Sequence, residues 1–114
     1  MIYYITARMK SIFVIDYSKG ESSVKVIEEA KNHFLKNPCE RFLVLTNVTG
    51  AVANQEYREK VKKYAPIFDR QAIKTCVIGL DLPKKIMLAT YNMFAQKKKI
   101  AFNTEKEAIE YLIA

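Results

Sequence analysis

Strand-like and helix-like segments alternate along nearly the whole chain, and this alternation is the feature that most constrains the fold. Short apolar runs rich in β-branched residues, at residues 11–17, 41–46, 73–79 and 99–102, indicate strands. Between and after them, apolar residues recur every three to four positions, as in amphipathic helices. Alternation of this kind is typical of right-handed crossovers and a mostly parallel sheet. The 114 residues therefore predict a single α/β domain spanning residues 1–114.

Two details refine this prediction. Residues 2–7 predict a leading edge strand that pairs antiparallel with the strand at residues 12–17. In the second helix, large apolar side chains from Tyr57 to Phe68 share one stripe and lysines lie opposite. Pro66 interrupts this stripe and predicts a kink or an early end of the helix.

The third helix, over about residues 84–96, is apolar around most of its circumference. Such a helix is either well buried or partly in an interface, including one between two copies of the chain. Asp81 is placed to cap its first turn. The sequence leaves these alternatives open.

The composition excludes several classes of protein. No apolar run approaches the roughly 18 residues of a membrane span, and the first residues lack the pattern of a signal peptide, so we expect a cytoplasmic protein. Cys39, Cys76 and the single histidine His33 are too few for a structural zinc site, which needs about four ligands. We therefore expect reduced thiols, no metal and no cofactor. A catalytic pair of His33 with one of the cysteines is a disfavoured alternative.

The net charge of +7 is unevenly distributed. Residues 57–100 carry eleven basic and three acidic side chains, so this stretch accounts for the whole excess. An anionic partner would explain it, but lysine-rich solvent faces on two helices are the simpler explanation. Nucleic acid is disfavoured because lysine dominates where base recognition relies on arginine. The candidate basic patch consists of Arg58, Lys62, Lys63, Lys84, Lys85, Lys97 and Lys98.

Polar residues follow the predicted strands at the edge where open α/β sheets bind ligands. Asp16 and Ser18 follow one strand, Asp81 follows another, and a turn from Thr46 to Gly50 lies between them. The sequence has no glycine-rich phosphate loop, nucleophile elbow or convincing carboxylate pair, so we expect no enzymatic activity. The polar turn can face an anion, or its side chains simply satisfy turn and cap hydrogen bonds.

Residues 45–51 (LTNVTGA), together with residues 12–18 (IFVIDYS), resemble the SpoIIAA-like branch of the STAS (sulfate transporter and anti-sigma-factor antagonist) fold, also described as STAS/SEC14. Residues 101–112 are similar to the closing strand and short helix of that branch. The resemblance implies a STAS-like regulatory module that binds another protein.

The resemblance also implies a switch residue. In the anti-sigma antagonists, a serine or threonine in an Asp-Ser-Ser/Thr-Gly turn is phosphorylated by a partner kinase, which changes binding. Here the matching turn places Thr49 at the acceptor position, beside Gly50. Asn47 stands in place of the aspartate and Val48 in place of a small polar residue, so the turn departs from the motif. A phosphate on Thr49 would add roughly 1.5 to 2 negative charges beside a basic helix.

The SEC14 side of the resemblance implies an alternative function, the binding of a small apolar or lipid-like ligand between the helices and the sheet. The candidate lining residues are Phe68, Met87, Tyr91 and Phe94. An ordinary core or an interface would use the same residues and is the simpler interpretation. The leading prediction is a non-enzymatic interaction module with an acidic protein partner, and binding to an anionic surface or nucleic acid through residues 57–100 is the lesser alternative.

Overall fold

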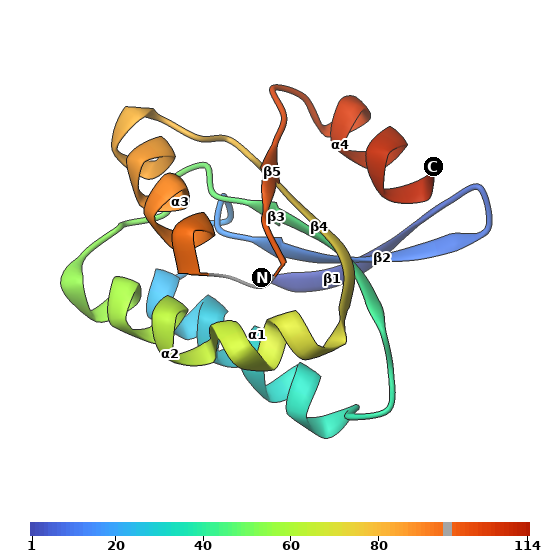
Figure 1. Ribbon diagram of the computed structural model, residues 1–114, viewed down its shortest axis with the longest axis horizontal. Coiled ribbons are helices and arrows are strands. Elements are labelled where there is room, and N and C mark those ends of the chain that lie inside the picture. Colours follow the sequence, from blue (N-terminus) through green and yellow to red (C-terminus); the bar gives the residue numbers. More distant parts are fainter. Residues whose placement is uncertain (95–96) are drawn as a thin grey trace.

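A computed structural model of the chain arranges its strands in one five-stranded sheet, in the sequential order β1-β2-β3-β4-β5 (Figure 1). The first two strands are antiparallel and every later neighbour is parallel, which confirms the predicted α/β class and its antiparallel edge strand. The structure describes residues 1–94 and 97–114, without the side chain of Phe94. The strands are β1 (Ile2–Ala7), β2 (Lys10–Asp16), β3 (Phe42–Asn47), β4 (Ala72–Ile78) and β5 (Ile100–Ala101).

The helices cover the two faces of the sheet unequally. Three of them lie on one face, and the last helix lies alone on the other (Figure 1). Since α1 packs closely on α2 and β2, that region is well covered, whereas the backbone of α3 stays farther from its neighbours. The helices are α1 (Ser23–Lys36), α2 (Gln55–Gln71), α3 (Leu82–Phe94) and α4 (Glu105–Ile113).

The alternation of side chains along β2 divides the interior into two cores. Phe13 and Ile15 face α1 and α2, while Ile12 and Val14 face α4. Phe34 of α1 is fully buried, with ring centroids 4.5 Å from Phe42 and 4.9 Å from Phe68. Because both faces of the central strands are buried, those strands are apolar along almost their whole length.

The structure corrects two of the predicted boundaries. The helix α2 continues through Pro66 to Gln71, so an early end at the proline is wrong. Pro66 and Lys62 are both exposed, and water can bind the Lys62 carbonyl that the proline leaves without an intrahelical donor. The strand β5 has only two residues, fewer than the predicted four. The predicted end of α3 at residue 96 lies outside the described residues.

The turn between β1 and β2 requires an uncommon backbone conformation. Arg8 and Met9 have φ angles of 47° and 66° and connect the paired residues Ala7 and Lys10. A two-residue hairpin turn with both residues in the left-handed region favours Asn-Gly. The chain instead places two long side chains there, and each such residue costs about 1–2 kcal/mol relative to glycine.

We expect the double substitution Arg8→Asn with Met9→Gly to raise the free energy of unfolding by about 1 kcal/mol, because it supplies residues suited to this turn. Urea denaturation of both proteins measures the change. Met9→Ala is the matched control, since it shortens an exposed side chain and keeps the conformational demand. A double variant no more stable than the control would contradict the interpretation.

Candidate functional site

At the carboxyl end of β2, the carboxylate of Asp16 is buried in a hydrogen-bond network. Its Oδ1 accepts from the N–H of Ser18 at 2.8 Å and from the Ser18 hydroxyl at 2.6 Å, and its Oδ2 accepts from the Tyr3 hydroxyl at 2.9 Å. Desolvation alone would raise the pKa of Asp16, but these hydrogen bonds outweigh it and the pKa lies below its usual value. Desolvation and the contact with Asp16 raise the pKa of Tyr3 to about 12. The carboxylate of Asp16 is therefore satisfied inside the fold by the half-buried Tyr3 and the exposed Ser18.

At the end of β3, Thr49 lies exposed in a turn held by hydrogen bonds. Its N–H donates to Asn47 Oδ1 at 3.1 Å, and the N–H of Val48 donates to the Ile78 carbonyl at 3.0 Å. Gly79 directly follows Ile78, and its φ of +81° favours glycine. A Cβ at that position would clash with Thr49 Oγ1 and lie 2.8 Å from Thr49 N. The end of β4 thus packs directly against the turn that carries Thr49.

At the start of α3, Asp81 and Lys84 join the helix to that turn. The backbone N–H of Lys84 donates to Asp81 Oδ1 at 3.0 Å, as expected for a helix cap. The ammonium of Lys84 donates to the Val48 carbonyl at 2.8 Å and lies 3.4 Å from Asp81 Oδ2. Lys84 is only 7% exposed, so its inclusion in the predicted basic patch is wrong. Its ammonium binds the Val48 carbonyl and the Asp81 carboxylate instead of a partner.

The rest of the predicted basic patch is divided among three parts of the surface. Arg58, Lys62 and Lys63 are exposed on α2, while Lys85 is exposed on α3 and Lys98 is exposed ahead of β5. The half-buried Lys97 donates from its ammonium to the Ala72 carbonyl. The seven residues therefore do not all present free charge to one partner.

The cysteines and the histidine occupy separate structural environments. Cys76 is fully buried, and burial raises its pKa to about 12, whereas Cys39 is exposed. His33 Nε2 lies 2.7 Å from the Tyr4 hydroxyl, and its ring stacks on Phe13 with centroids 4.9 Å apart. Within the described residues, no hydrogen bond joins His33 to a cysteine, and no cluster of three or more histidine, cysteine or acidic residues could hold a metal ion.

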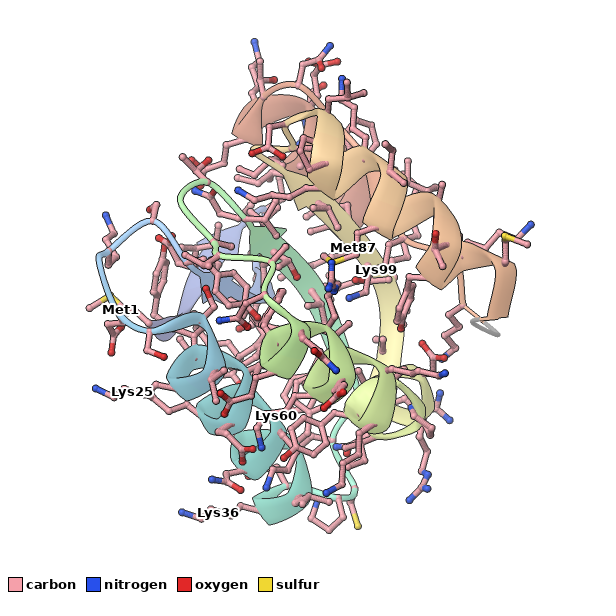
Figure 2. All side chains as sticks on the ribbon, turned by 90° about the vertical axis from the view of Figure 1, so that its left-hand side faces the viewer. Met1, Lys25, Lys36, Lys60, Met87 and Lys99 are labelled. Atoms are coloured by element: carbon pink, nitrogen blue, oxygen red, sulfur yellow. The ribbon has the colours of Figure 1, made fainter. Side chains whose placement is uncertain are left out.

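A cavity of about 70 Å³ lies between α2, α3 and the sheet. Two of its lining residues, Met87 and Lys99, are labelled in Figure 2. The predicted lining residues Phe68, Met87 and Tyr91 all border it, and the side chain of Phe94 lies outside the described part of the chain. Most of the lining is apolar. The charged side chains that also border the cavity are Asp69, Lys84 and Lys99.

Sequence reasoning missed Asp69 and Lys99 as cavity residues. The place of Lys84 at the cavity could have been predicted from helical spacing. Lys84 precedes Met87 by three residues and Tyr91 by seven, so it lies on the helix face that borders the cavity. No comparable pattern marks Lys99, which follows a run of lysines.

The opposite face of α3 is exposed and apolar. Leu82, Ile86 and Met93 are 72%, 62% and 77% exposed. Their spacing of four and seven residues puts them on one side of the helix, opposite Met87 and Tyr91. The helix is therefore not well buried, because one face borders the cavity and the other is open to solvent. An interface on the outer face stays a prediction.

The sequential sheet, with three helices on one face and one on the other, is a SpoIIAA-like fold of the STAS type, as the sequence resemblance predicted. In structure the chain is similar to an uncharacterized protein of the DUF3478 family with a SpoIIAA-like fold from Shewanella loihica PV-4. The TM-score is 0.70 at 10% sequence identity, over 98% of this chain and 92% of that chain, and a likeness at this identity shows the fold alone. No protein-family model matches the sequence, and no curated protein matches it significantly. Among the described residues, no helix is long and apolar enough to cross a membrane.

We expect Gly79→Ala to destabilise the chain more than Gly20→Ala. Both glycines have a φ of +81°, but a Cβ at Gly20 meets no atom within 4 Å, so Gly20→Ala is the matched control for backbone strain alone. The control should cost about 1–2 kcal/mol, and crowding against Thr49 should add about 1–3 kcal/mol for Gly79→Ala. Urea denaturation measures both changes, and equal losses would show that the close packing against the turn has no energetic weight.

We expect Asp16→Asn to lower the free energy of unfolding at pH 7 by about 1–3 kcal/mol, because the variant weakens hydrogen bonds to a buried charge. Since the pKa of Asp16 is lower in the folded state, the ionised carboxylate stabilises the fold above the unfolded pKa of about 4, and this contribution is lost as the pH falls through the folded pKa. Urea denaturation at pH 7 and pH 3 should therefore show a smaller difference from wild type in acid. Glu110→Gln on the exposed side of α4 is the control, and an equal Asp16→Asn deficit at both pH values would refute the role of ionisation.

Proposed function

We propose that the chain is a non-enzymatic regulatory module that binds a protein partner through the outer face of α3. The observation that carries this proposal is the exposure of Leu82, Ile86 and Met93 on one side of that helix. Large apolar side chains gathered on one surface are typical of interaction sites. Full burial of each would contribute about 1.5–3 kcal/mol, so this face alone supplies a substantial driving force for association.

The charge around this face favours an acidic partner. Lys85, the neighbour of Ile86 in the chain, is exposed on α3. The net charge of +7 adds a general attraction for negatively charged surfaces. A second copy of the chain would bring the same positive charges to the interface, which disfavours a homodimer at this face.

Thr49 is suited to regulate such a module through α3. The ammonium of Lys84 donates a hydrogen bond to the carbonyl of Val48, the residue before Thr49. It also lies beside Asp81 at the start of the helix. A change in the turn would therefore reach the helix that carries the apolar face. Thr49 is exposed, but its phosphorylation stays a prediction.

A second candidate function is the binding of a small apolar ligand. The cavity between α2, α3 and the sheet supports it, because Phe68, Met87 and Tyr91 give the cavity an apolar wall. This function and the first are compatible, since they use opposite faces of α3. Binding to an anionic surface or to nucleic acid has less support, because Lys84 and Lys97 donate within the fold.

We expect Ile86→Glu to abolish partner binding while the fold remains intact, because it puts a negative charge in the middle of the exposed stripe. The experiment immobilises the full chain and measures, by quantitative mass spectrometry, which acidic proteins it retains from an extract of its native cells. Retention of the partner should fall at least about tenfold, equivalent to 1.4 kcal/mol. Leu35→Glu is the matched control, because Leu35 is also exposed on a helix but lies on α1.

Two results would contradict the proposal. Equal retention of the same proteins by wild type and by both variants would remove the role of α3. A wild-type dimer in analytical ultracentrifugation that Ile86→Glu converts to a monomer would assign the face to self-association, and the acidic partner would be withdrawn.

A further inference from the structure

Lys99 is held in place by the end of α3. The side-chain amide of Asn92 donates to the Lys99 carbonyl at 2.9 Å and accepts from the Lys99 N–H at 2.9 Å. These two hydrogen bonds attach the residue just before β5 to the helix. The Lys99 side chain then enters the space between α2 and α3, next to Met87 (Figure 2).

The ammonium of Lys99 has an apolar and aromatic environment. It lies 4.6 Å from the centroid of the Tyr91 ring, and the Tyr91 hydroxyl donates to Asp69 Oδ1 at 3.4 Å. In the described part of the chain, neither an ion pair nor a hydrogen bond holds the Lys99 ammonium. Burial lowers its pKa to about 8, against the opposing effect of the Asp69 carboxylate.

Lys84 differs from Lys99 in having two partners for its ammonium. Both lysines border the same cavity, but the Lys84 ammonium has a carbonyl at 2.8 Å and a carboxylate at 3.4 Å. Lys84 is thus satisfied by the fold itself. Lys99 is a half-buried charged group in a mostly apolar wall, and Asp69 and the Tyr91 ring offset its desolvation only in part, so an anionic ligand would complete the compensation.

The chemistry of the ligand follows from the cavity. One unpaired ammonium suits a single negative charge, and the neighbouring Asp69 carboxylate disfavours a dianion such as a phosphate monoester. The apolar lining suits a hydrocarbon body. The cavity volume of about 70 Å³ has room for about five water molecules, so the part of the ligand inside it is compact.

We propose that the cavity beneath α3 binds a monocarboxylate with a compact apolar body, whose carboxylate pairs with the ammonium of Lys99. This proposal rests on the second candidate function, the binding of a small ligand in the same cavity, and adds the class of ligand and the residue that recognises it. The Tyr91 ring lies over the ammonium and lines the same space, so it packs against the ligand's first carbon atoms.

The test uses hexanoate and its neutral counterpart hexanamide as probes, with the full-length chain. Amide shifts in NMR spectra report binding up to about 10 mM, because a ligand of this size is expected to bind in the millimolar range. We expect hexanoate to bind wild type at least about tenfold more tightly than hexanamide. Lys99→Met should remove this preference for the acid and keep the affinity for the amide, and Lys98→Met, which alters an exposed neighbour, should behave as wild type.

The pH dependence supplies an independent readout. Pairing requires the protonated ammonium, so the affinity for hexanoate should fall by up to about tenfold per pH unit above pH 8, while that for hexanamide should stay constant. The other ionisable groups that face the cavity are Asp69 and Tyr57 from α2, Lys84 and Tyr91 from α3, and Tyr17 after β2. Burial raises the pKa of each of the three tyrosines, so they keep their protons in this range.

The outcomes separate this inference from the function on which it rests. If hexanoate and hexanamide bind equally and Lys99→Met changes neither affinity, the cavity binds apolar ligands and the role of Lys99 is overturned. If neither probe shifts the amide signals of cavity residues, ligand binding at this cavity fails and the inference fails with it. The comparison of acid and amide on wild type needs no variant, so misfolding of Lys99→Met cannot obscure the result.

Discussion

A parallel sheet must be covered by helices on both faces, because its central strands are apolar on both sides. In this chain β5 has only two residues, so the sheet is narrow at the edge where α3 must pack. The two helices before it fill their part of the same face around Phe34. On the other face, α4 buries Ala108 and Leu112 completely. The helix α3 covers its part incompletely, and this deficit leaves the cavity beneath the helix. The apolar face above it is exposed because Leu82, Ile86 and Met93 lie on the side away from the sheet.

Polar contacts hold α3 at both of its ends. Where α3 begins, Lys84 connects the helix to the turn after β3 through the Val48 carbonyl and Asp81. Where α3 ends, the side-chain amide of Asn92 connects it to the backbone of Lys99 through two hydrogen bonds. The helix is therefore held by polar contacts at both of its ends, while apolar packing in its middle is left incomplete. Such an arrangement anchors the two ends of a helix without filling the space under it.

The sequence predicts the elements well and the site only in part. Apolar β-branched runs identified β2, β3 and β4, because burial on both faces of a sheet gives a pattern that no solvent-exposed segment shows. The end of α2 was missed because the effect of Pro66 depends on whether water reaches the carbonyl one turn earlier, which only the fold decides. For the cavity, Phe68, Met87 and Tyr91 could be named from helical spacing, since spacing fixes which side chains share a face.

The environments of Lys98 and Lys99 could not be predicted in the same way. A lysine next to other lysines has the same sequence signal whether its ammonium is solvated, as at Lys98, or lies against an aromatic ring, as at Lys99. The difference arises from the contact between Asn92 and the backbone seven residues later, which is a tertiary effect. Net charge is likewise a property of the composition, whereas the availability of each charge depends on its local partners.

The two faces of α3 belong to one rigid element, and this links the two proposed activities. A ligand under the helix would add packing where the fold leaves a cavity, and so would favour one position of the helix over others. A partner on the outer face would make its contacts with that same position. Any ligand that changes the affinity for the partner must, by thermodynamic reciprocity, have its own affinity changed by the partner to the same extent. Because Lys84 joins the Thr49 turn to the first turn of α3, a charge added at Thr49 would act on the same equilibrium. Regulation of the proposed kind would need no large rearrangement, since a small shift of one incompletely packed helix would change both surfaces together.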